Sequence, residues 1–510
     1  MSATDGERLE IHWLPLTREP EYLARVEAAM GEWGVDAVHL SHRLCHVADS
    51  LIDDPERAET IRGWTHRFRD AGAKVWLWTH EVHAPPPEFV REGRLDTDEP
   101  GLYEHLAQKY RHVFDAVAPE VDGVVLTFAE TQFPVYQASR IRSAQSPPAR
   151  VAALVSVMRN ACIAQGRRLA VRDFVYRRDE VEAMREAIDG TYADVAVMSK
   201  CVPHDWHPYY PANPLVGAWP GREQWIEHDL GHEYEGQHLY PFADLRTLWT
   251  RLEHGRGHGA RAVCLRLDRY HGDCGQSALD TPWGRLELTA AHRFAREPGV
   301  ELDQVWKDWE ATQFPGARRL TEVATAAAMK FLFPMRMWLA DHSRLPSYAY
   351  AVSHLNDGNA DRLHTWTGAD RDRETDDLFR RMPPSWLAQL LAEGDEARAL
   401  AQRCVETVND TDDLGPDAAA WTLGVERLAI WADLFHAYRE AFFRLRFADL
   451  QPGVSRVREI ELAVDRLEQT IRAHRPRLAQ QQTESGPSAL TRGPPHELID
   501  DFRRRIGALV

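Results

Sequence analysis

Short apolar runs alternate with amphipathic helical runs over the first three hundred residues of the chain. The helical runs place apolar residues three or four positions apart, as at Leu23, Val26 and Met30. This alternation is typical of parallel strands joined by helices, and eight steps match the size of a (β/α)8 TIM barrel. A doubly wound sheet needs the same alternation, but the absence of a glycine-rich phosphate turn favours the closed barrel. The expected strands are Leu9–Leu14, Ala37–Leu40, Val75–Trp78, Gly123–Leu126, Leu169–Val171, Val195–Met198, Trp225–Leu230 and Ala262–Leu267.

The strand pattern stops after Phe314 and Pro315, and helical runs rich in Ala, Leu, Arg and Glu follow. We therefore expect two domains, a catalytic α/β barrel over residues 1–315 and an α-helical domain over residues 316–510. Residues 480–495 are rich in polar residues, Pro, Gly and Ser, and they are expected to form a mobile segment. The expected helical runs are Thr321–Leu339, Ser385–Leu400, Ala418–Phe443 and Val454–His474.

The overall charge limits the classes of partner. The 510 residues carry a formal net charge of -17 and contain no run of Lys or Arg, so neither nucleic acid nor an anionic membrane is expected as a partner. The N-terminal ten residues hold neither a basic nor an apolar leader region, and no stretch approaches about 20 apolar residues, so we expect a cytoplasmic protein. The six cysteines form no C-x-x-C pair, which favours reduced thiols.

Charged residues follow four of the expected strands. In a parallel barrel, residues just past the carboxyl ends of the strands surround the mouth. Hydrolysis of a glycosidic bond needs one protonated carboxyl group, which donates to the leaving oxygen, and one ionised carboxylate across the sugar ring. Cations beside these carboxylates either balance their charge or bind an anionic group of a substrate. The residues are Glu130 after the fourth strand, Arg172 after the fifth, Lys200 and Asp205 after the sixth, and Glu233 after the seventh.

Four tryptophans fall near expected strand ends: Trp13, Trp78, Trp206 and Trp219. An aromatic face at a barrel mouth can stack on a sugar ring, whereas the same side chain in a core fills space. Both interpretations stay open for each tryptophan, and we take Trp13 and Trp219 as the candidates for substrate binding.

The order and spacing of these residues resemble the α-glucuronidases of glycoside hydrolase family 67. The segment GVVLTFAETQFP carries Glu130 at the place of the catalytic acid of the family, and VRDFVY carries Arg172 before an F-V-Y run. The sixth-strand motif K-N-G-P-x-D of the family is matched by KCVPHD, from Lys200 to Asp205. The P-L-x-G-x-x-P segment of the family is matched by PLVGAWP, and its Glu-Tyr pair is matched at Glu233.

The resemblance implies an inverting, exo-acting hydrolase that removes glucuronic acid or its 4-O-methyl ether from oligosaccharides without a cofactor. It implies that Glu130 is the general acid and that Asp205 or Glu233 activates water. It implies that Arg172 and Lys200 bind the carboxylate of the sugar. It further implies a homodimer through the helical domain. The expected partner is thus a uronic-acid-containing oligosaccharide.

Three features depart from the family. A family lysine four residues before the acid is Leu126 here, and the Asn-Gly after the sixth-strand lysine is Cys201-Val202. The N-terminal β-sandwich of the family has no counterpart, since the expected barrel begins near Leu9. The similarity runs from Leu9 to Glu310 and weakens in the helical tail. It supports the reaction type better than the identity of the sugar, so another uronide or a neutral glycoside is compatible as a substrate.

A metal-dependent barrel hydrolase is the rival interpretation. The chain has 24 histidines, and five of them lie near the candidate carboxylates. No H-x-H follows the first strand and no H-E-x-x-H occurs, so we expect no catalytic metal. A sugar-binding barrel without activity is a further alternative, although three candidate carboxylates speak against it. The five histidines are His204, His207, His228, His232 and His238.

Overall fold

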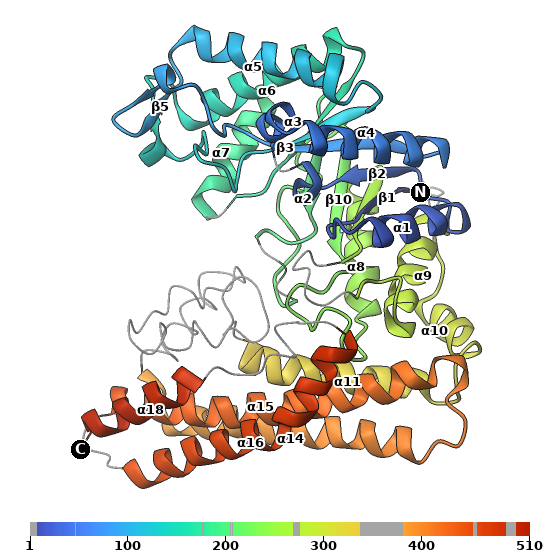
Figure 1. Ribbon diagram of the computed structural model, residues 1–510, viewed down its shortest axis with the longest axis vertical. Coiled ribbons are helices and arrows are strands. Elements are labelled where there is room, and N and C mark those ends of the chain that lie inside the picture. Colours follow the sequence, from blue (N-terminus) through green and yellow to red (C-terminus); the bar gives the residue numbers. More distant parts are fainter. Residues whose placement is uncertain are drawn as a thin grey trace, which may run out of the picture.

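The first part of the molecule is a closed barrel of eight parallel strands, and its C-terminal part is a layer of long helices (Figure 1). This arrangement confirms the predicted barrel followed by a helical region. The computed structural model describes residues 8–45, 47–175, 178–204, 206, 208–268, 276–336, 381–451, 456–485 and 496–509.

The barrel strands pair in the order in which they occur in the chain, and the last strand closes on the first. Each step is therefore a parallel neighbour of the step before it, as the alternating sequence predicts. The strands are β1 (Glu10–Leu14), β2 (Ala37–Leu40), β3 (Lys74–His80), β6 (Gly123–Thr127), β8 (Arg168–Arg172), β9 (Ala196–Lys200), β10 (Gln224–Asp229) and β11 (Ala262–Arg266).

Helices cover the outside of the barrel, and several begin at a side-chain cap followed by proline. Asp54 accepts a hydrogen bond from the backbone N–H of Arg57 at 3.0 Å, and Thr281 accepts one from Gly284 at 3.1 Å. Between β9 and β10 the described residues form turns instead of a helix. The helices of this part are α1 (Pro20–Trp33), α2 (His42–Cys45), α3 (Ala48–Asp53), α4 (Pro55–Asp70), α5 (Pro100–His112), α6 (Pro147–Ala164), α7 (Arg178–Asp189), α8 (Leu245–Gly257), α9 (Pro282–Arg296) and α10 (Leu302–Glu310).

A small three-stranded sheet lies outside the barrel and is absent from the sequence prediction. Its strands hold only two or three residues each, which is too short for an alternating pattern to be read. They are β4 (Val90–Arg91), β5 (Arg94–Asp96) and β7 (Ile141–Arg142).

Side chains at alternate strand positions fill the barrel interior, with large aromatic rings beside small residues. A Cβ atom at Gly123 would lie 2.3 Å from the ring of Trp76, so only glycine fits beside this tryptophan. Ala170 of β8 and Met198 of β9 belong to the same interior cluster. Because side chains alternate along a strand, Arg172 and Lys200, two positions later, point into the barrel mouth.

The C-terminal helices pack against α9 at the barrel. The ring of Trp283 on α9 lies 5.4 Å from that of Trp421, and Arg285 forms an ion pair with Asp417 at 2.8 Å. The helices are α11 (Ala317–Leu332), α14 (Pro384–Asn409), α15 (Ala418–Leu450), α16 (Val457–Ser485) and α18 (His496–Leu509).

The two expectations about domain organisation have different outcomes. Helix α16 continues to Ser485, so residues 480–485 of the expected mobile segment are helical, and residues 486–495 lie outside the described part of the chain. The domain boundary at residue 315 stays a prediction.

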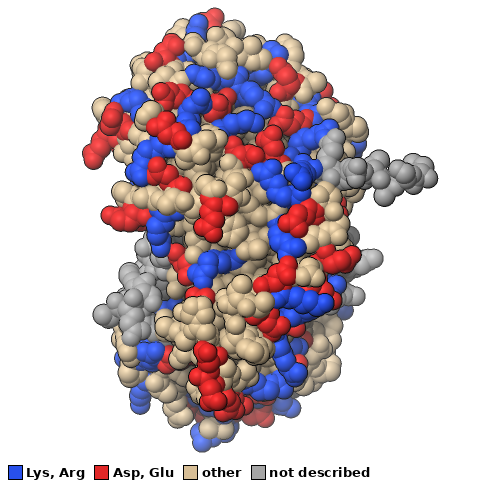
Figure 2. Space-filling view, turned by 90° about the vertical axis from the view of Figure 1, so that its right-hand side faces the viewer, with Lys and Arg blue, Asp and Glu red and all other residues tan. Residues whose placement is uncertain are grey.

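The expectations drawn from hydropathy, net charge and cysteine content can be compared with the structure. None of the described helices combines the length and the apolar character needed to cross a membrane. On the face shown in Figure 2, acidic and basic side chains are interspersed, so the negative net charge is not gathered in one patch there. The five described cysteines are buried and free, in agreement with the expected reduced thiols; they are Cys45, Cys162, Cys201, Cys264 and Cys404.

Candidate active site

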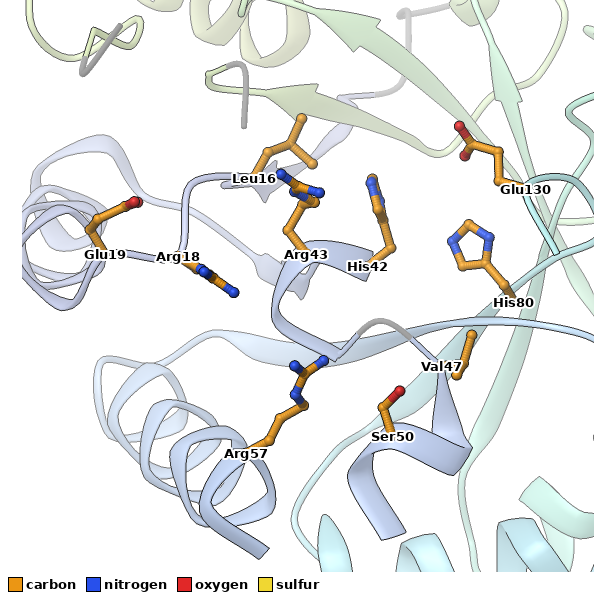
Figure 3. Close-up of a pocket in the computed structure, with 10 residues that line it drawn as sticks. All are labelled: Leu16, Arg18, Glu19, His42, Arg43, Val47, Ser50, Arg57, His80 and Glu130. Atoms are coloured by element: carbon orange, nitrogen blue, oxygen red, sulfur yellow. The ribbon is translucent and has the colours of Figure 1, made fainter. Parts of the chain in front are cut away.

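A pocket of about 620 Å³ lies at the carboxyl ends of β1, β2, β3 and β6. This volume is within the range of small-molecule sites, and the place is the one where barrel enzymes hold their reactive groups. In Figure 3, Glu130 and His80 lie at one side of the pocket, with His42 beside them, whereas Arg18 and Arg57 lie farther away. The lining residues are Leu16, Arg18, Glu19, His42, Arg43, Val47, Ser50, Arg57, His80 and Glu130.

Glu130 is the sequence-predicted residue that lines this pocket. It follows β6 by three residues and has a backbone φ of 56°, a left-handed conformation that few residues other than glycine adopt. Its side chain is exposed at the pocket wall. Such backbone conformations cost free energy and are concentrated at functional sites. Glu130 thus combines an exposed side chain at the pocket wall with a strained backbone.

Two histidines beside Glu130 were not predicted. The Nδ1 atom of His80 lies 3.0 Å from the carbonyl oxygen of Ala129, and a carbonyl only accepts, so this nitrogen donates the hydrogen bond. The ring centroid of His42 lies 5.5 Å from that of His80. His42 follows β2 and His80 is the last residue of β3, so applying the strand-end rule to these two strands would have found them.

A second group of charged residues lies at the carboxyl ends of the other four strands. The fork of Arg172 donates two hydrogen bonds to Glu227, at 2.6 and 3.0 Å, and both side chains are buried. Arg266 on β11 donates to Glu233 at 3.4 Å, and its Nε lies 3.9 Å from Asp229. These arginines hold the carboxylates of β10 and its loop in place. We call Arg172, Lys200, Glu227, Asp229, Glu233 and Arg266 the axial cluster.

Aromatic rings surround the cations of the axial cluster. The Nζ atom of Lys200 lies 4.1 Å from the ring centroid of Phe174 and 4.5 Å from that of Trp206. Trp78 joins the cluster to the pocket, because its ring lies 5.1 Å from the guanidinium of Arg172 and 6.0 Å from the ring of His42. Trp78 thus lies between His42 of the pocket and Arg172 of the axial cluster.

The structure brings Arg172, Lys200 and Glu233 together in the axial cluster, with Glu130 at the neighbouring pocket. Asp205 lies outside the described residues, as does His207. Glu227 and Arg266 were missed by the sequence reasoning. Glu227 lies within β10, two positions after Trp225, which points into the barrel. Because side chains alternate along a strand, the sequence WIEHDL could have indicated that Glu227 also points inward.

The substrate-binding role expected for two tryptophans needs correction. Trp13 is fully buried and donates from Nε1 to His292 of α9 at 3.1 Å. It points to the helix layer, since Leu14 takes the inward position on β1. Trp219 is 6% exposed and packs in the main hydrophobic core. Neither ring presents an open face to a sugar.

Burial raises the pKa of Asp173 to about 7. The Asp173 carboxyl group accepts a hydrogen bond from Ser199 at 2.5 Å. The folded chain therefore keeps a proton that an unfolded aspartate, with a pKa of about 3.9, has lost. Since the folded state binds more protons between these two pKa values, this group makes stability fall as the pH rises through that window.

Replacing Asp173 by asparagine should flatten the pH dependence of stability. The wild-type chain is expected to lose up to about 1.4 kcal/mol per pH unit from this group between about pH 4 and pH 7, and the variant should not. Urea unfolding midpoints of both proteins across this range measure the difference. Parallel curves for the two proteins would show that Asp173 does not titrate in this window.

Comparisons with known proteins give a fold and no family. No protein-family model matches the sequence, and no curated protein matches it. Among solved structures of glycoside hydrolases, a GH138 enzyme that targets pectin rhamnogalacturonan II aligns with 98% of this chain and 68% of its own, at 13% identity and a TM-score of 0.62. The GH115 4-O-methyl-α-glucuronidase BtGH115A, with specificity for decorated arabinogalactans, aligns with 97% of this chain and 61% of its own, at 10% identity and a TM-score of 0.49. The protein described here therefore shares with the GH138 enzyme a fold that extends over the barrel and the C-terminal helices.

Proposed function

We propose that the chain is a glycoside hydrolase that releases a uronic acid from the end of an α-linked oligosaccharide. The observation that carries the proposal is the pocket at the barrel mouth, whose lining holds the carboxyl group of Glu130 at one side and five basic side chains. A carboxyl group in such a pocket can give the leaving oxygen its proton, and a cationic lining favours an anionic sugar. The basic residues are Arg18, His42, Arg43, Arg57 and His80.

In this proposal Glu130 is the general acid and Glu233 is the carboxylate that activates water. Glu233 is buried and accepts a hydrogen bond from Arg266 at 3.4 Å, which orients its carboxylate. Asp205 stays the second candidate for this role. The resemblance to family 67 supports inversion of the anomeric carbon, for which the two carboxyl groups must be separated by about 6.5 to 9.5 Å so that water fits between them.

The contacts of Arg172 change its proposed role. The guanidinium fork of Arg172 is bound to Glu227. Arg172 therefore balances the charge of this buried carboxylate and fixes its orientation within the axial cluster. We therefore assign the carboxylate of the sugar to Lys200 and to the arginines of the pocket. Lys200 is 3% exposed and sits between two aromatic rings, where a charge–charge contact is screened little by solvent.

A matched pair of substrates tests the proposal. An aryl α-glucuronide and the aryl α-glucoside with the same leaving group differ only in the carboxylate at C6. The kcat/KM for the glucuronide should be about 10 to 100 times higher, which corresponds to one charge-assisted hydrogen bond of about 1.5–3 kcal/mol. Equal values would point to a neutral glycoside as substrate, and turnover of neither compound would remove the proposal.

A further inference from the structure

A buried group of three side chains lies outside the pocket of Glu130. One ligand atom each of His232, His238 and Glu287 lies within 4.8 Å of the other two, and all three residues are buried. The two histidines belong to the loop after β10, whereas Glu287 belongs to α9, about fifty residues later. The fold has therefore brought two imidazoles and one carboxylate together from separate elements.

His238 is the residue that ordinary packing leaves unexplained. Its side chain is 1% exposed, and its Nε2 lies 2.5 Å from the carbonyl oxygen of Leu230, so Nε2 donates and Nδ1 holds a lone pair. Nδ1 is buried and has no hydrogen-bond partner among the described residues. An unsatisfied buried acceptor costs about 1–3 kcal/mol. Metal-binding histidines commonly donate their other ring N–H to a backbone carbonyl in this way.

His232 and Glu287 are close contacts of each other, through Nε2 and Oε2. The second oxygen of Glu287 accepts a hydrogen bond from the backbone N–H of Asp244 at 3.1 Å, which orients the carboxylate. A buried histidine–glutamate ion pair alone would account for these two residues. It would leave the lone pair of His238 without a partner, whereas an ion shared by all three satisfies every group.

A carboxylate and a small cavity lie next to the group. Glu235 lies 3.7 Å from Nδ1 of His232, whereas Glu287 contacts Nε2 of the same ring, so Glu235 can orient the ring from its other side. A cavity of about 60 Å³, lined by His232, Glu235 and Glu287 among others, is large enough for a water molecule. This cavity and the pocket of Glu130 have no lining residue in common, so the group is a separate site.

We propose that His232, His238 and Glu287 bind a divalent transition-metal ion, with zinc as the expected ion. Two imidazoles and one carboxylate are a ligand set that zinc uses, and nitrogen ligands favour transition metals over magnesium or calcium. The ion would tie the loop after β10 to α9. Because Glu233 follows His232 directly, the site would also fix the loop that presents Glu233 to Arg266. The proposal concerns structure and does not depend on the proposed hydrolysis.

Metal content tests the site. The full chain, without an affinity tag and dialysed against metal-free buffer, should retain about one zinc ion per molecule by mass spectrometry. The variants His238→Gln and Glu287→Gln should lose at least about ten-fold in retained zinc. His66→Gln changes a histidine on α4 whose side chain is 64% exposed, and this control should retain the ion.

A second readout keeps the test valid if a variant fails to fold. Chelation should lower the Tm of the wild-type chain, and added zinc should restore it, since an ion that binds only the folded state stabilises it. Replacement of the zinc ion by cobalt should give the protein a visible absorption band, as expected for a cobalt ion that is bound by nitrogen ligands. Zinc content no higher in the wild type than in His238→Gln, together with a Tm that responds to neither chelator nor zinc, would overturn the proposal.

Discussion

Replacement of Glu130 by glutamine is expected to lower kcat for a uronic-acid-containing oligosaccharide by about 10²–10⁴-fold, because an amide cannot protonate the leaving oxygen. The two side chains have nearly the same size, so KM should change much less than kcat. Glu130 is exposed to the pocket and is not part of the core, so the variant should fold normally. Steady-state kinetics with an oligosaccharide whose leaving group is a sugar hydroxyl measure the effect.

The leaving group provides the control for this prediction. An aryl glycoside with an acidic phenol needs little proton donation, so the loss in kcat on Glu130→Gln should be much smaller for it. Glu104→Gln, an exposed change on α5, should leave both rates unchanged. Wild-type rates in Glu130→Gln, or the same loss for both leaving groups, would exclude Glu130 as the general acid.

Replacement of Arg172 by alanine is expected to destabilise the chain by about 3–5 kcal/mol, because the buried carboxylate of Glu227 loses both hydrogen bonds of the fork and keeps only the longer ion pair with Arg266, at 4.0 Å, among the described residues. Glu227 is 0% exposed and receives both hydrogen bonds of the Arg172 fork. The urea unfolding midpoint measures the loss. In the double variant Arg172→Met, Glu227→Met, which removes both charges, much of the stability should return.

A matched control for Arg172→Ala is an exposed ion pair at the opposite ends of β8 and β10. Arg168 and Glu223, at the other end of β8 and beside β10, form an ion pair whose side chains are 46% and 36% exposed. Because exposed ion pairs contribute about 0–1 kcal/mol, Arg168→Ala should cost much less than Arg172→Ala. Equal losses from the two alanine variants would show that the Arg172–Glu227 pair has no special role in the barrel.

The sequence predicts the barrel well because its signal is local. Each strand of a parallel barrel is buried on both faces, so it appears as an apolar run such as VVL before Thr127 or AVM before Ser199, and each crossover adds a helical period. Residues just past such a run must lie at the mouth. This rule is sufficient to place Glu130 at the pocket and Arg172 and Lys200 in the axial cluster.

The remaining features depend on which face a residue occupies and on contacts between distant segments. Trp13 lies near a strand end, but one position of difference turns it to the helix layer. The partner of Arg172 is 55 positions away, and no local pattern indicates that Glu227 occupies its fork. The proximity of His238 to Glu287 likewise arises only when α9 packs on the loop after β10.

The released sugar tests the central claim most directly, namely that the barrel mouth hydrolyses the bond to a terminal uronic acid. NMR of the wild-type protein with a panel of oligosaccharides that carry α-linked uronic acids should show a free uronic acid, first in the β-anomeric form that inversion produces. Release of neutral sugars alone, or no release from any member of the panel, would contradict the account.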